Sequence, residues 1–408
     1  MSKLKSNPGI GVLAAGSVLQ LFLGIIYCWS AFVAPLNSYF EGKVKVNDIK
    51  LTSQFMLCCF VLGILASGQL QRKFKAKWLT LAGGGLMAVG MFIASFVSKN
   101  GGGSVWLIYI AYGVLGGLGV GLAYNTVITC AQKWFPKNRG LATGISVCTF
   151  GFATVIFAPL VKSLVGATGV ISTLRILAGA FILVTLALFS FIKLPDEAAN
   201  TAAANAALDK KQYTTSEILK TKNFYFITLS MMFFTATYFF LNPSFGTLAA
   251  NRYGESGGDL GIIILQITGV ASAIGRLLVP LLGDKIGRAG ATLSIICATV
   301  LSAIVLGISG APSFLFIAAI AVIAFCYGGS SGVYPVLTSE QFGIKHVGSN
   351  YGAVMVGFAV SALVFPSIIR LFGEDGSSAQ FVVLTIMAFI AAVLIFLLMN
   401  DKKKEQKN

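Results

Sequence analysis

The sequence predicts an all-α membrane protein whose twelve transmembrane helices form two six-helix halves. The first observation is composition: only 11% of the residues are charged, against about 25% in ordinary soluble domains, and 56% are hydrophobic. The second is that the apolar residues gather in stretches of about 20, the length with which a helix crosses about 30 Å of hydrocarbon. The third is a single long polar segment that leaves six such stretches on either side.

The twelve apolar stretches are the expected transmembrane helices, and they leave no room for a sizeable soluble domain. They cover residues 10–34, 51–71, 78–98, 104–131, 141–162, 172–193, 223–249, 259–283, 291–310, 312–336, 348–372 and 378–400. The basic N-terminus followed by an apolar run is similar to a signal peptide. Because that run is long enough to span a bilayer and no clear small-residue cleavage site follows it, we expect it to remain as the first helix.

The polar segment at residues 194–222 is the expected cytoplasmic connector between the halves. We therefore expect a first half at residues 1–193, a second half at residues 223–400 and a cytoplasmic tail at residues 401–408. A faint internal repeat supports this division, because basic loops recur at matching places in the two halves. The matching loops are residues 68–75 with 281–288, and residues 135–144 with 342–352.

Basic residues are divided unevenly between the two faces of the membrane. The net charge is +16, and with the N-terminus inside, 21 of the 30 Lys and Arg residues fall on the cytoplasmic side, eight on the outer side and Arg276 on neither. This bias predicts a multi-pass protein of the plasma (inner) membrane with both termini in the cytoplasm. The excess charge therefore indicates topology and attraction to the lipid bilayer, and we expect no binding to nucleic acid.

Signals for catalysis or metal binding are weak. All seven cysteines lie in apolar stretches, so they indicate neither a disulfide framework nor a zinc site. The run Gly328-Gly329-Ser330-Ser331-Gly332 fits a hydrolase nucleophile pattern, but the only histidine, His346, lies in an expected loop. We therefore expect no enzyme activity, no metal and no cofactor, and we expect the protein to act as a monomer.

Arg276 is the most informative single residue. It lies eight residues before Asp284, at the end of its helix, and therefore about 12 Å inside the membrane. A charge at that depth costs at least about 2.5 kcal/mol, so it should face a cavity or a partner. All fourteen carboxylates lie in loops, tails or helix ends. Because a guanidinium offers paired donors to a carboxylate, we predict that Arg276 binds a small carboxylate anion, the alternative being a structural ion pair.

Other polar side chains fall on single faces of apolar helices. In the tenth helix Tyr327, Ser330, Ser331 and Tyr334 follow the spacing i, i+3, i+4 and i+7, which places them on one face. Comparable groups on the first, fourth and seventh helices include Tyr27, Tyr124, Asn125 and Tyr238. For any one of them, helix packing or anchoring at the lipid interface is the simpler explanation.

Several motifs point to a known family. The loop Asp284-Lys285-Ile286-Gly287-Arg288 resembles the loop signature of the major facilitator transporters. The stretch from Gly119 to Gly144 is more specific, because it contains Tyr124-Asn125 and Lys133-Trp134-Phe135-Pro136-Lys137-Asn138-Arg139-Gly140-Leu141-Ala142. With Tyr27-Cys28-Trp29-Ser30, and with Arg276 twelve residues before Arg288, the chain resembles the oxalate:formate antiporter family, which is close to the monocarboxylate porters.

This resemblance implies the major facilitator fold, a carrier of small organic anions and a set of site residues. In that fold the first, fourth, seventh and tenth helices line the cavity, and Tyr27, Trp29, Tyr124 and Tyr327 would enclose the anion beside Arg276. The candidate binding residues are Arg276, Tyr27, Trp29, Tyr124, Asn125, Tyr238, Tyr327, Ser331 and Phe358. The candidate residues of a conformational gate are Arg139, Asp284, Lys285, Gly287 and Arg288.

Two departures from the family pattern bear on the cargo. Members that carry the oxalate dianion have a lysine eight residues after the Asn of an Asn-Tyr-Gly motif, but here that position, counted from Asn350, is Phe358. Ser331 stands where those members have a tyrosine. One buried cation in place of two predicts a monocarboxylate of the formate, acetate, lactate or pyruvate class.

Three functions therefore remain open. The first is exchange or facilitated passage of a monocarboxylate, with oxalate:formate antiport as an alternative. The second is proton-coupled symport, although proton-coupled porters often have an aspartate four residues before the arginine, where this chain has Ser272. The third is a membrane sensor that detects an anion, for which the tail and the connector offer no output domain.

Overall fold

The computed structural model describes residues 8–99, 104–195, 212–242, 248, 253, 256–308, 310, 312–373 and 376–405, and the regular elements among them are helices. The N-terminal half contains α1 (Pro8–Leu23), η1 (Gly24–Cys28), α2 (Ser30–Tyr39), α3 (Val46–Leu70), α4 (Ala76–Ala94), α5 (Ser104–Ile108), η2 (Tyr109–Gly116), α6 (Gly117–Trp134), α7 (Arg139–Thr168), α8 (Val170–Leu188) and η3 (Phe189–Phe191). The C-terminal half contains α11 (Lys222–Leu241), α13 (Ser256–Ile286), α14 (Arg288–Gly307), α15 (Ser313–Phe342), α16 (Val347–Arg370) and α17 (Ser378–Glu405), preceded by the short α10 (Thr215–Ile218).

The prediction of twelve membrane spans is confirmed. Within the described residues, twelve helical stretches are long and apolar enough to cross a bilayer, and each overlaps one predicted stretch. The first predicted span differs in detail, because α1 gives way to a 3₁₀ segment, η1, where Gly24 lies against the backbone carbonyl of Phe150. The seventh ends earlier than predicted, at Leu241, and the rest of its predicted length lies mainly outside the described residues. Most of the predicted connector, residues 196–211, also lies outside them.

Apolar side chains cover the outside of the helices as well as their interior. Large hydrophobic residues such as Leu183, Leu301 and Phe389 are more than half exposed. A surface of this kind is suited to lipid and would be poorly soluble in water. Together with the twelve spans, it identifies a multi-pass membrane protein.

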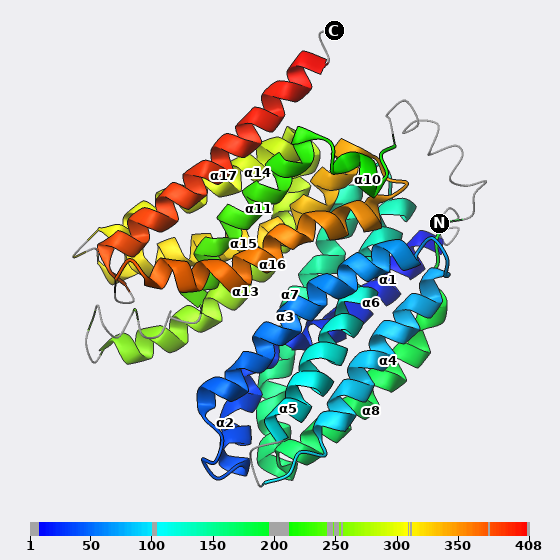
Figure 1. Cartoon of the computed structure of the whole chain (residues 1–408), viewed down its shortest axis with the longest axis vertical. Coiled ribbons are helices and arrows are strands. Elements are labelled where there is room, and N and C mark those ends of the chain that lie inside the picture. Colours follow the sequence, from blue (N-terminus) through cyan, green and yellow to red (C-terminus); the bar gives the residue numbers. More distant parts are fainter. Residues whose placement is uncertain are drawn as a thin grey trace, which may run out of the picture.

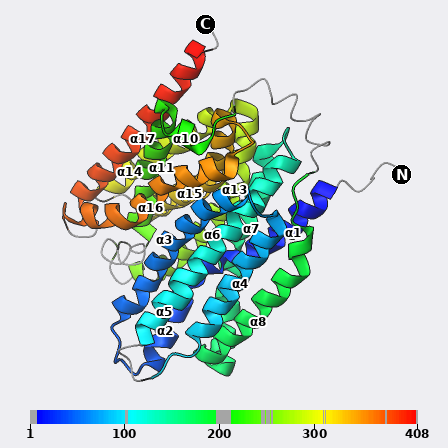
Figure 2. The ribbon, with the colours of Figure 1, turned by 45° about the vertical axis from the view of Figure 1, so that its right-hand side comes forward.

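The two halves lie side by side, and the helices of each half stay together. Figure 1 shows α1 to α8 on one side of the molecule and α11 to α17 on the other. The halves meet where α7 packs on α13 and α3 packs on α16, which Figure 2 shows from a second direction. α1 begins and α17 ends at the same end of the helices (Figure 1). We call this end, which carries the basic loops, the predicted cytoplasmic end.

Glycines allow α6 to pack closely on α3 and α4. A Cβ atom added to Gly121 would overlap the carbonyl oxygen of Phe60 on α3, and one added to Gly119 would overlap that of Gly83 on α4. Small residues of this kind let the backbones of membrane helices approach each other closely. Gly119 and Gly121 thus belong to a helix-packing surface of α6.

Candidate substrate-binding site

Arg276 lies inside the molecule on α13, where the two halves meet. It is only 3% exposed, and its Nε and Nη1 atoms have no hydrogen-bond partner among the described residues. None of the ion pairs in the described part of the chain includes it. A buried, unpaired guanidinium is costly unless a partner arrives, so this arrangement is suited to binding an anion.

Aromatic rings of the N-terminal half lie against this cation. The guanidinium carbon is 5.4 Å from the centroid of the Tyr27 ring and 5.7 Å from that of Phe150. Both distances are within the range of cation–π attraction, which extends to about 6 Å. Phe150 in turn packs against Tyr124, with ring centroids 4.8 Å apart. Arg276 of the C-terminal half is therefore held against rings of the N-terminal half.

The C-terminal half adds a second aromatic group. Tyr238 and Tyr327 stack in parallel, with centroids 3.7 Å apart and an interplanar angle of 7°. Phe239 connects this pair to Phe358. Its ring lies edge-on to Tyr327, with centroids 5.7 Å apart, and edge-on to Phe358, with centroids 4.9 Å apart. Several tyrosine hydroxyls interact electrostatically with Arg276. They belong to Tyr27, Tyr124, Tyr238, Tyr327 and Tyr351.

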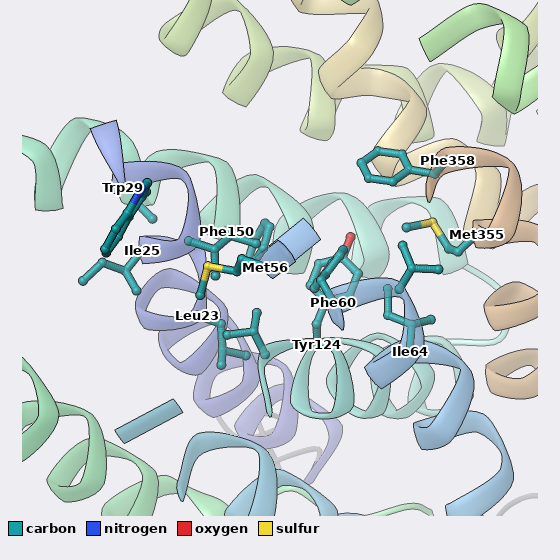
Figure 3. Close-up of a cluster of buried hydrophobic side chains, with 14 of the residues drawn as sticks. Leu23, Ile25, Trp29, Met56, Phe60, Ile64, Tyr124, Phe150, Met355 and Phe358 are labelled. Carbon is teal, nitrogen blue, oxygen red and sulfur yellow. The ribbon is translucent and has the colours of Figure 1, made fainter. Parts of the chain in front are cut away.

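Trp29 belongs to a different part of the aromatic core. Its ring packs on Tyr112, with centroids 4.4 Å apart, and its indole nitrogen donates a 2.8 Å hydrogen bond to the carbonyl oxygen of Ile49. Figure 3 shows Trp29 on one side of the buried cluster and Phe358 on the opposite side, with Phe150 and Tyr124 between them. The structure thus brings Tyr27 and Tyr124 close to Arg276, whereas Trp29 is engaged elsewhere.

Asn125 joins the two halves. Its Nδ2 atom donates to the carbonyl oxygens of Ile64 on α3 and Gly348 on α16, each at 3.0 Å. Its Oδ1 atom is buried and has no partner among the described residues. Ser349, the residue after Gly348, donates a 2.7 Å hydrogen bond to the carbonyl oxygen of Gly68 on α3. These bonds close the halves together toward the predicted cytoplasmic end.

The polar face predicted on the tenth helix, α15, has two kinds of member. Tyr334 and Ser330 are engaged in packing, because Tyr334 shares a 2.9 Å hydrogen bond with Ser230 on α11 and Ser330 donates to the carbonyl oxygen of Tyr327. Tyr327 faces Arg276, and Ser331 is half-buried on the same helix. Spacing along the helix alone did not separate these roles.

Two of the candidate gate residues, Asp284 and Arg288, form a compact group beside the N-terminus of α7. Asp284 accepts a 3.1 Å bond from the backbone N–H of Leu141, at the N-terminus of α7, and pairs with Arg288 at 2.5 Å. Arg288 also lies 3.4 Å from Glu340 on α15. A carboxylate at a helix N-terminus is stabilised by the unpaired N–H groups there.

The remaining gate candidates have separate places. Arg139 donates to the carbonyl oxygen of Pro136 at 3.0 Å. Gly287, with φ +85°, separates α13 from α14, and a backbone of that kind favours glycine. Lys285 is exposed.

The sequence did not single out Phe150, Gly151 or Phe239. Aromatic and glycine residues are abundant in membrane helices, so none of the three stands out. One available signal was the spacing of Gly140, Gly144 and Gly151, which places three small residues on one face of α7. In the structure, that face meets α13.

A buried cation between two bundles of apolar helices is suited to binding an anion. No group of His, Cys, Asp or Glu side chains that could hold a metal ion occurs in the part of the chain that the structure describes. The fold, two bundles of membrane-spanning helices, is that of a membrane transporter. The chain belongs to the Major Facilitator Superfamily, which it matches over residues 14–366 and again over residues 288–408. This family consists of transporters and not of enzymes.

Individual relatives are distant. The chain is 27% identical over 353 residues to the uncharacterized MFS-type transporter YhjX of Escherichia coli (strain K12), covering 85% of this chain and 84% of the relative. It is 26% identical over 405 residues to the oxalate:formate antiporter of Oxalobacter formigenes, covering 96% and 91%. The solved structure of the proton:xylose symporter XylE has the same fold, with a TM-score of 0.73 at 15% identity over 96% of each chain.

Proposed function

We propose that this chain exchanges small monocarboxylates across the plasma (inner) membrane by alternating access, with Arg276 as the cation that binds the carboxylate. The observation that carries this proposal is the burial of Arg276 without an ion pair among the described residues. A carboxylate cargo would supply the missing charge and accept hydrogen bonds from the guanidinium. The similarity to the oxalate:formate antiporter supports an organic anion as cargo.

The surroundings of Arg276 favour an anion with one carboxylate. Tyr327, which interacts electrostatically with Arg276, packs against the ring of Phe239, and Phe239 packs in turn against Phe358. A second carboxylate placed there would be buried without a partner, which is costly. The tail of a monocarboxylate such as lactate or pyruvate would instead bury apolar surface against these rings. Oxalate:formate antiport remains the second candidate, because a relative of that name matches 96% of the chain.

The contacts between the halves support the conformational part of the proposal. The bonds of Asn125, Ser349 and Asp284 join the halves at the predicted cytoplasmic end. These bonds would have to break for the cargo to leave on that side, so we assign the Asp284–Arg288 loop and Arg139 to the gate. In this scheme residues 1–193 and 223–400 are the moving halves, residues 194–222 connect them, and both termini lie in the cytoplasm. We further propose that a single chain is the transporting unit.

An empty carrier would keep an unpaired cation in its cavity while its halves close, which is costly. Exchange is therefore expected to be faster than net flow. Coupling to protons would need an ionisable relay, and Ser272 stands where a carboxylate would be required one turn from Arg276. Exchange driven by the anion gradients is the simpler cycle.

The test uses the purified protein in proteoliposomes. Vesicles preloaded with lactate, pyruvate, acetate, formate or oxalate are compared with empty vesicles for uptake of radiolabelled substrate. We expect internal monocarboxylate to accelerate uptake strongly and an imposed pH gradient to add little. Fast uptake into empty vesicles, driven by an inward proton gradient and abolished by a protonophore, would replace exchange with symport. No counterflow of any carboxylate would refute the anion assignment.

A further inference from the structure

Gly151 on α7 lacks a side chain at the point where the Arg276 side chain reaches the N-terminal half. A Cβ atom at residue 151 would lie 2.8 Å from Cδ, 2.9 Å from Nε and 3.3 Å from Cζ of Arg276. Two of these distances are shorter than real contacts of a Cβ atom, so an alanine would force the guanidinium to move. The glycine is therefore part of the space that the cation occupies.

Beside Gly151, the guanidinium of Arg276 lies against two aromatic rings. Tyr27 and Phe150 provide the rings, at 5.4 Å and 5.7 Å from the guanidinium carbon. Nε and Nη1 remain without hydrogen-bond partners among the described residues. Contact with ring faces does not use the N–H donors, and although Arg276 also hydrogen-bonds Tyr27, Nε and Nη1 stay available for a ligand. Phe150 is the residue directly before Gly151, so one short segment of α7 supplies both a ring and the gap.

We propose that Gly151 is a positioning residue of the anion site: its missing side chain lets Arg276 lie against Tyr27 and Phe150, which hold the guanidinium ready for a small carboxylate. The identity of the ligand rests on the proposed function, whereas the placement of Arg276 does not. The cation comes from the C-terminal half and its support from the N-terminal half. A side chain at residue 151 therefore weakens anion binding although the charge of Arg276 is kept.

Gly144 provides a matched control on the same helix. A Cβ atom there would lie 3.1 Å from the carbonyl oxygen of Leu277 and 3.3 Å from that of Arg276, so it would meet the backbone of α13 and not the guanidinium. Both Gly151→Ala and Gly144→Ala add one methyl group to the packing of α7 on α13. Only the first is expected to displace the cation.

The first measurement is counterflow of radiolabelled lactate by the full chain in proteoliposomes. For Gly151→Ala we expect KM to rise about tenfold, as for the loss of one hydrogen bond between charged groups, with a smaller change in maximal rate. For Gly144→Ala we expect KM to stay close to that of the wild type. Equal KM values for the two variants, raised or unchanged, would overturn the proposal.

The second measurement needs no ligand. In protein labelled with ¹⁵N-arginine, the Nε–Hε NMR signal of Arg276 is identified among those of the seven arginines by its loss in Arg276→Lys. Ring currents from Tyr27 and Phe150 should shift this signal upfield. We expect the shift to shrink in Gly151→Ala and in Phe150→Leu, and to persist in Gly144→Ala.

The two measurements separate the two proposals. If the wild type exchanges no carboxylate, the proposed function fails, and the Arg276 signal still tests the role of Gly151. An unshifted Arg276 signal in the wild type overturns the inference even if lactate exchange is normal. If Gly151→Ala does not fold, Phe150→Leu takes its place. An Arg276 Nε–Hε signal whose ring-current shift is the same in Phe150→Leu as in the wild type would then overturn the inference.

Discussion

Two arginines twelve residues apart in the C-terminal half have opposite surroundings. Arg288, at the start of α14, pairs with Asp284 at 2.5 Å and with Glu340 at 3.4 Å, and its side chain is 21% exposed. Arg276, in α13, is 3% exposed and contacts rings, with no carboxylate paired to it in the described part of the chain.

Under the proposed function, this difference distinguishes a structural cation, Arg288, from a binding cation, Arg276. The charge of Arg288 is matched by fixed carboxylates, which suits a residue that holds a loop and a helix end in place. The charge of Arg276 lacks such a match, and burying it is costly until an anion arrives. Under the proposed function, an anion that binds Arg276 would neutralise this charge at the junction of the two halves. Its binding free energy could then favour closure of the halves around it.

Neutralising each arginine in turn gives the largest expected effect. Arg276→Gln should abolish exchange, because losing the cation partner of a buried carboxylate costs about 3 kcal/mol or more, a factor of about 100. Arg276→Lys should bind the anion weakly, because an ammonium does not offer the planar donor pair. Arg288→Gln should slow exchange but leave the affinity for substrate close to that of the wild type. Counterflow and equilibrium binding, at matched expression, measure the two properties.

A specific outcome would remove the distinction between the two arginines. If Arg276→Gln transports at a near-normal rate, or if Arg288→Gln loses substrate affinity to the same extent, the binding cation has been assigned to the wrong place. Size-exclusion profiles and thermal unfolding of both variants establish that each protein is folded.

The fold was predictable because the bilayer imposes it. Backbone groups in hydrocarbon must be satisfied within the segment, so a run of about 20 apolar residues has almost no alternative to a helix. The 3₁₀ segment at Gly24–Cys28 and the π-helical segment at Tyr109–Gly116 were not predictable, because they depend on how neighbouring helices pack.

The cluster of candidate site residues was predictable only where a residue is rare for its surroundings, and its role in binding stays a prediction. Arg276 stood out because a charge deep in an apolar helix needs a reason. Trp29 and Tyr124 had the same support in the sequence, yet only Tyr124 lies beside the cluster around Arg276, while Trp29 binds the carbonyl oxygen of Ile49. Phe150 and Gly151 gave no chemical signal, since their role comes from the approach of α7 to α13.

A second cation at the level of Arg276 is expected to change selectivity. Phe358 is buried, with its ring against Phe239, which also packs against Tyr327. Phe358→Lys would offer a dianion a partner for its second carboxylate. We expect the ratio of oxalate to lactate transport to rise about tenfold, as for one hydrogen bond between charged groups.

Competition of unlabelled oxalate against labelled lactate measures this ratio, and Phe358→Met, which keeps an apolar side chain, is the control. Wild-type protein that is already inhibited by micromolar oxalate and not by monocarboxylates would reverse the assignment of the cargo. An unchanged ratio in Phe358→Lys would mean that residue 358 does not face the bound anion.

The smallest expected effect concerns the charge of the predicted cytoplasmic end, at His346 in the loop between α15 and α16. Burial lowers the pKa of His346, the charges of Arg72, Lys345 and Lys133 lower it further, and Glu217 opposes them. Arg72 and Lys133 belong to the N-terminal half, whereas Lys345 belongs to the C-terminal half with His346. A proton on His346 therefore adds like charge across the junction of the halves.

The sign follows from proton linkage. In the structure the two halves are in contact at the predicted cytoplasmic end, and we call this the closed arrangement. Because it lowers the pKa of His346, it binds this proton less readily than an arrangement in which the loop between α15 and α16 is free. The closed arrangement therefore loses stability as the pH falls below about 6.5, the ordinary pKa of histidine, and keeps it at higher pH.

Lowering the pH on this side should favour opening there and change the rate of exchange by about twofold, since partly exposed charge pairs contribute less than about 1 kcal/mol. His346→Gln should remove this part of the pH profile, and His346→Arg should resemble the acidic wild type at pH 7.5. The profiles are measured by lactate counterflow with the pH varied on one side only. Identical profiles for the wild type and His346→Gln would show that the proton acts elsewhere, for example on the cargo.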